Sequence, residues 1–160
     1  MSGSDDDFRL LARAFPKLKR LVVPPANYDC TGRTLACLYH FSGECADLLE
    51  IKIGLSFDIS ENLDAIKKVP HPIVRNCRHP LQKLYIHSKF GQLQPTHSVQ
   101  VAHFLDLIFP NLSTLEFVTD DFGKRVVRYD SNKTEAANWA GIQEICLALQ
   151  QARLSSASDI

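Results

Sequence analysis

The sequence predicts an α/β fold, specifically a short right-handed solenoid of about four helix–strand repeats around a parallel sheet. Four segments fit the template Leu-x-x-Leu/Ile-x-apolar without gaps, and a stretch with helical periodicity precedes each one. Their leading leucines are spaced by 30, 33 and 31 residues, which indicates a period. The four expected strands lie near 18–23, 48–53, 81–86 and 112–117.

The first repeat begins with a helix. Phe8, Leu11, Ala12 and Phe15 fall on one helical face, and three aspartates, 5–7, stand at the amino end, where negative charge complements the helix dipole. Pro16 then separates this helix from the strand near 18–23, since proline cannot continue a helix.

The second and third helices are shorter. The stretch 34–41 places Leu35, Leu38 and Phe41 on one stripe, ahead of the strand near 48–53. Before the third strand, Ser60 is the expected cap of a weaker helix. That helix contains Leu63, Ile66 and Lys67 and ends at Pro70 and Pro72.

The fourth helix is the clearest. It is expected over 98–109, with Ser98 as its cap and an apolar stripe of Val101, Phe104, Leu105, Ile108 and Phe109. After the fourth strand the period fails, so we expect a loop over 120–133. A strong helix over 134–153 follows, with Trp139, Ile142, Ile145, Cys146 and Leu149 on one stripe. This helix should cap the open end of a single domain spanning 1–160.

One face of the sheet is expected to remain open. The strands alternate apolar and polar residues, as a sheet covered on one face requires, whereas a doubly wound domain needs near-continuous apolar strands. We interpret the open face as a protein-binding surface with Tyr85 as its aromatic anchor; an unused, solvated face is the alternative. Its residues are Arg20, Glu50, Lys52, Lys83, Tyr85, His87, Thr114 and Glu116. Within it, Glu50 is expected to pair with Arg20 and with Lys83.

Composition argues against several classes of protein, namely nucleic-acid-binding, membrane-bound and secreted ones. Eighteen basic and eighteen acidic residues cancel, so no net field favours nucleic acid or an anionic membrane. No apolar run is long enough to span a membrane, and the acidic amino terminus is unlike a signal peptide. Five cysteines without a CxxC pair are typical of a reducing compartment, so we expect the cytoplasm or nucleus.

Catalytic and metal-binding motifs are also missing. The chain has no Gly-x-Ser-x-Gly, GxxxxGK, GxGxxG or HExxH sequence. The pairs Cys77 with His79 and His97 with His103 lack further ligands at metal-binding spacing, and Cys77 with His87 is no supported nucleophile pair. We therefore expect no enzyme activity, no cofactor and no metal.

The repeats resemble the leucine-rich-repeat region of fungal F-box-like proteins, a group found especially in mushroom-forming fungi. The resemblance lies in Phe15-Pro-x-Leu-x-x-Leu, in Val101-Ala-x-Phe-Leu-x-x-Ile-Phe-Pro-Asn-Leu-x-x-Leu-Glu and in the Trp139-containing helix ending near Ala152-Arg153. It implies a substrate-recognition module of a cullin-type ubiquitin ligase. Only Ser2 to Asp7 precede the first repeat, too few for an F-box, so contact with the adaptor and cullin is not expected. A free-standing scaffold unrelated to ubiquitin, or a small doubly wound ligand-binding or enzyme domain, are the alternatives.

Overall fold

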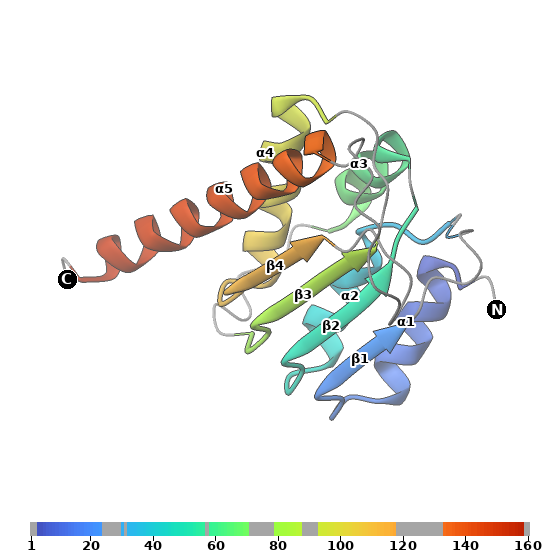
Figure 1. Ribbon diagram of the computed structural model, residues 1–160. Helices are drawn as coiled ribbons and strands as arrows, with labels where there is room; N and C mark the ends of the chain where they lie inside the picture. Colours follow the sequence, from blue (N-terminus) through green and yellow to red (C-terminus); the bar gives the residue numbers. More distant parts are fainter. Residues whose placement is uncertain are drawn as a thin grey trace.

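The protein is an α/β fold in which five helices accompany a four-stranded parallel sheet (Figure 1). The computed structural model describes residues 3–23, 30, 32–56, 58–70, 79–87, 93–117 and 133–158. Within them helices and strands alternate, and the strands lie in the order β1-β2-β3-β4, each beside its neighbour in sequence. This sequential order is what a chain of helix–strand units predicts.

The strands are β1 (Arg20–Val23), β2 (Glu50–Gly54), β3 (Lys83–His87) and β4 (Thr114–Phe117). Each begins two residues later than its template leucine. Their register matches the alignment of the four sequence segments. One row across the sheet is Arg20, Glu50, Lys83 and Thr114, and the next row on that face is Val22, Lys52, Tyr85 and Glu116.

The five helices are α1 (Asp5–Ala14), α2 (Cys37–Glu44), α3 (Ile59–Lys68), α4 (Pro95–Ile108) and α5 (Lys133–Ser158). A capping box starts α1, because Ser4 Oγ accepts from Asp7 N–H while the Asp7 carboxylate accepts from Ser4 N–H. α5 confirms the expected terminal helix but extends five residues beyond 153. Of the expected loop over 120–133, residues 120–132 lie outside the described residues, whereas Lys133 begins α5.

Two expected helix caps are wrong. Asp58, not Ser60, caps α3, since its carboxylate accepts from the N–H groups of Ser60 and Glu61. Ser98 lies inside α4, which begins three residues earlier because Pro95 is tolerated in the first turn of a helix. In both helices a residue that precedes the serine, Asp58 in α3 and Pro95 in α4, marks the start of the helix instead.

The sheet has one buried and one open face. Leu21, Ile51, Ile53, Leu84 and Leu115 point into the core, whereas the alternate residues in the first two rows of the other face remain at least partly accessible. In Figure 1, α1, α2 and α4 lie behind the sheet, and no described helix crosses in front of the strands. A doubly wound domain would cover both faces.

The same turn joins helix to strand in three of the four units. The residues that end α1, α2 and α4 are Phe15, Cys45 and Phe109, with φ/ψ of −129°/64°, −114°/73° and −132°/72°. The carbonyl of each accepts a hydrogen bond from the N–H of the template leucine three residues later, at 3.1–3.2 Å. The same backbone geometry thus recurs at equivalent positions of three of the four sequence segments.

Side chains connect these turns into a ladder on backbone carbonyls. Cys45 Sγ donates to Phe15 O at 3.5 Å, His79 Nε2 donates to Cys45 O at 3.1 Å, and Asn111 Nδ2 donates to His79 O at 3.0 Å. We call this set the carbonyl ladder. Each rung comes from one unit and bonds to the unit before it, so the ladder ties all four units together.

The helix α5 closes the far end of this arrangement. Gln150 Nε2 donates to Leu112 O at 3.0 Å, and Arg153 Nη2 approaches Pro110 O at 3.4 Å. The Arg153 guanidinium also binds the Asp106 carboxylate of α4 at 2.6 Å. Trp139, Ile142 and Cys146 are buried along the helix. Thus α5 supplies hydrogen-bond donors to the Leu112 and Pro110 carbonyl groups in the last turn.

His79 makes the fold sensitive to acid. Its Nδ1 accepts from Leu81 N–H at 3.2 Å, so the buried ring is neutral with its proton on Nε2. Burial lowers the pKa of His79 below its ordinary value of 6.5. A lowered histidine pKa stabilises the fold fully above the unfolded-state value, and this contribution is lost as the pH falls below about 6.5.

We therefore expect the free energy of unfolding to fall between pH 7 and pH 5, by at most about 1.4 kcal/mol per pH unit for one proton. Urea denaturation at several pH values measures this slope. The variant His79→Gln should have a shallower slope; an unchanged slope would assign the effect to other groups. His40, whose pKa burial also lowers, should contribute the remainder.

Candidate functional site

The candidate site is the open face of the sheet, here defined by Arg20, Val22, Glu50, Lys52, Lys83, Tyr85, Thr114 and Glu116. Strand periodicity places all of them on the side opposite the core leucines, and the register brings them into two adjacent rows. Seven of these eight residues are the ones that the sequence predicts for this surface.

The centre of the open face is an ordered polar network. The Arg20 guanidinium lies 3.2 Å from Glu50 Oε1, and the Lys52 ammonium lies 3.6 Å from the same oxygen. The Lys52 ammonium also lies 4.5 Å from the centroid of the Tyr85 ring. The Glu50 carboxylate and the Tyr85 ring thus hold the Lys52 side chain in one position. Because this side chain is already ordered, less of its conformational entropy is lost when a partner binds.

The outer part of the open face has unpaired charges. Among the described residues, neither Lys83 nor Glu116 has an ion-pair partner, and both side chains are exposed. The expected pair between Glu50 and Lys83 is wrong, because Glu50 instead binds Lys52, two residues along its own strand. Lys83 and Glu116 lie on different rows and are available to a partner's charges.

His87 does not belong to the accessible surface, contrary to the expectation. Only 9% of it is exposed, and Gly54, its partner in register, is buried as well. The chain continues beside β3 beyond the end of β2, where Leu55 N–H donates to His87 O at 2.9 Å. The face is therefore covered at the carboxyl ends of β2 and β3, and its described accessible residues lie in the first two rows.

Val22 also belongs to the open face, although it is not among the binding residues that the sequence predicts. It is 44% exposed and lies beside Lys52 in the register. The alternation that places Arg20 on this face also places Val22 there, so the signal was present in the sequence. An exposed apolar residue beside the Lys52–Tyr85 pair gives the surface a hydrophobic component.

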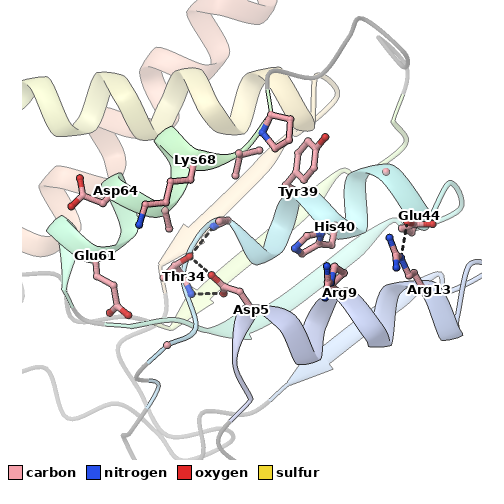
Figure 2. Close-up of a pocket in the computed structure, with 16 residues that line it drawn as sticks. Asp5, Arg9, Arg13, Thr34, Tyr39, His40, Glu44, Glu61, Asp64 and Lys68 are labelled. Atoms are coloured by element: carbon pink, nitrogen blue, oxygen red, sulfur yellow. Dashed lines mark hydrogen bonds and ion pairs between the residues drawn. The ribbon is translucent and has the colours of Figure 1, made fainter.

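A second feature is a cleft of about 900 Å³ between α1, α2 and α3, on the helical side of the molecule (Figure 2). Its lining includes one ion pair and one hydrogen-bonded carboxylate. Arg13 Nε binds Glu44 at 3.3 Å, and Asp5 accepts from the Thr34 hydroxyl at 2.6 Å and from its N–H at 2.7 Å. These contacts join α1 to the segment leading into α2, which gives Asp5 a structural role.

The titration behaviour of the cleft follows from burial. Burial raises the pKa of Asp5, although its hydrogen bonds with Thr34 oppose the shift. Burial lowers the pKa of His40, and the neighbouring Arg9 acts in the same direction. Of the residues that line the cleft, only Thr34 has an aliphatic hydroxyl, and that hydroxyl donates to the Asp5 carboxylate.

The described cysteines, Cys30, Cys37, Cys45 and Cys146, are buried, and the last three carry free thiols. Burial raises the pKa of Cys37 and Cys45, and that of Cys146 to about 12. The thiolate is the reactive form, so these thiols are poor nucleophiles at neutral pH. Cys77 lies outside the described residues, so the structure does not place it relative to His79 or His87.

The described part of the chain contains neither a metal-binding cluster nor a helix suited to crossing a membrane. No group of three or more histidine, cysteine, aspartate or glutamate side chains there is placed to hold a metal ion. None of the helices described is both long enough and apolar enough to cross a membrane. Comparison of the chain with protein-family models, curated proteins and solved structures finds no match.

Proposed function

We propose that this chain is a non-catalytic protein-binding module that holds its partner on the open face of the sheet. The observation that supports this most directly is the Arg20–Glu50–Lys52–Tyr85 network beside the exposed Val22. Aromatic and arginine side chains with adjacent apolar area are typical of the residues that dominate binding energy at protein interfaces.

The architecture we propose for the module is a short right-handed solenoid of leucine-rich-repeat type. Three observations support it: the sequential strand order, the turn that recurs at Phe15, Cys45 and Phe109, and the carbonyl ladder. In solenoids each repeat contacts mainly its neighbours and the sheet surface is a common place for binding.

We further propose, from the resemblance to fungal F-box-like proteins, that the partner is a protein selected for ubiquitination. The module would act in the cytoplasm or nucleus, which the buried free thiols support. Direct contact with the adaptor and cullin is not part of this proposal. A scaffold unrelated to ubiquitin uses the same surface and differs only in what it captures.

The test is affinity purification of the tagged chain from its native cells, with Lys52→Glu/Tyr85→Ala/Lys83→Glu as the variant of the open face. We expect the wild type to enrich a specific protein and the variant to retain less than a tenth of it. Lys17→Glu/Lys68→Glu is the matched control, because both lysines are exposed outside this face and the charge change is equal.

Circular dichroism and thermal melting establish that all three proteins fold. Equal capture by wild type and variant, or no specific capture by the wild type, contradicts the proposal. Ligase components in the wild-type eluate would favour the ubiquitin role, and their absence would favour the scaffold.

A further inference from the structure

A hydrophobic groove of about 410 Å³ lies between α3 and α4, on the helical side and away from the open face. Its apolar lining consists of Leu63, Ile66 and Val69 from α3 and its end, and Val99, Phe104 and Leu107 from α4. Leu63 and Phe104 form the buried floor, whereas Val99 and Leu107 are 52% and 41% exposed. The groove is therefore a surface feature whose apolar walls face solvent.

The outer side of α4 is unusual for a surface helix. Val99, His103 and Leu107 follow one another at intervals of four residues and form an exposed stripe with no lysine, arginine, aspartate or glutamate. The only such residue in α4 is Asp106, which is buried and bound to Arg153. Surface helices ordinarily carry charge on the outer face, and an exposed apolar stripe instead marks a contact surface.

One lysine, Lys67, and one histidine, His103, line the groove, and none of the residues that line it is acidic. Lys67 lies 3.2 Å from Asp64, but both side chains are exposed, and such surface pairs contribute little, so the ammonium remains available to a partner. A second copy of the chain would bring the same basic rim against this one, which disfavours self-association.

We propose that this groove docks an amphipathic helix of a partner protein whose polar side is acidic. Two helices that frame an apolar channel match the helix-in-groove mode of recognition, in which apolar anchors at i, i+3 or i+4, and i+7 enter the channel. Carboxylates flanking those anchors would meet Lys67 and His103. The site is independent of the open face, so the molecule has two docking surfaces on opposite sides.

The experiment is selection of a phage-displayed library of helical peptides on the full 160-residue chain, with counter-selection on Val99→Glu/Leu107→Glu. We expect enriched peptides with apolar residues at the stated spacing and with Asp and Glu in excess of Lys and Arg. A synthetic peptide of the leading sequence should bind the groove variant at least ten-fold more weakly, and Lys67→Glu several-fold more weakly.

Two controls separate this proposal from folding effects and from the open face. Leu10→Glu/Leu147→Glu places the same charges at exposed apolar positions outside the groove and should leave peptide affinity unchanged, as should Lys52→Glu/Tyr85→Ala/Lys83→Glu. Val99→Ser/Leu107→Ser is a milder groove variant, which should still bind at least ten-fold more weakly. Equal enrichment on wild type and groove variant, or enrichment of basic peptides, overturns the proposal. So does a wild-type dimer in sedimentation that the groove variant converts to monomer.

Discussion

Replacement of Phe109 by alanine should lower the free energy of unfolding by about 3–5 kcal/mol. The Phe109 side chain is fully buried, and its ring meets the His79 ring edge to face with centroids 5.0 Å apart. The residue also ends α4 and begins the turn into β4. Truncation therefore leaves a cavity where a helix, a strand and the carbonyl ladder meet. Urea denaturation followed by circular dichroism measures the change.

Phe15 is the matched control, because it occupies the same position in the first unit. It is 55% exposed, so Phe15→Ala should cost less than about 1 kcal/mol. A similar loss in both variants would mean that burial is not what distinguishes the two positions. The difference between the two losses of unfolding free energy measures the contribution of burial by a neighbouring unit. Cys45 and Phe109, which occupy this position in later units, are completely buried.

The second large effect is expected for Asn62→Ala, at about 2–4 kcal/mol. Asn62 is fully buried and makes three hydrogen bonds: Oδ1 accepts from Leu35 N–H at 2.8 Å, and Nδ2 donates to Ser56 O and Asp58 O at 3.2 and 2.7 Å. Alanine leaves all three backbone groups without this partner. Leu35 N–H lies just before α2, so the loss disconnects α2 from α3.

Asn111→Ala provides the comparison for Asn62. Asn111 is exposed and donates one side-chain bond, to His79 O at 3.0 Å. Its removal should cost about 0.5–1.5 kcal/mol. Thermal melting of the two variants side by side tests the order. A larger loss at Asn111 than at Asn62 would place the main stabilising contact in the carbonyl ladder.

Much of the sheet could be predicted because its signals are local and periodic. The leucine spacing aligned the strands, and alternation then assigned each residue to a face, so Lys52 and Tyr85 appear side by side as expected. Phe15 shows the limit of this logic. Its helical position predicts burial, but burial requires a neighbouring element, and among the described residues such an element covers Cys45 and Phe109 but not Phe15.

The features that sequence reasoning missed depend on contacts between distant residues. His79 interacts with Cys45, and Asn62 with Leu35, across 34 and 27 positions, and no motif marks either pair. Glu50 likewise had two lysines within reach, and only the side-chain geometry decides for Lys52 over Lys83. Val99 and Leu107 belong to an apolar helix, and their exposure depends on how α3 packs beside it.

The two edges of the sheet differ in a way that bears on misassembly. Beyond β4, α5 packs alongside and bonds to the carbonyls of Leu112 and Pro110. Among the described strands, β1 pairs with β2 alone, so its other side presents backbone groups along Arg-Leu-Val-Val. Unpaired edges of this kind template the addition of foreign strands. A foreign strand would therefore be expected to add at the edge formed by β1, where Arg20 is the one charged residue of the strand.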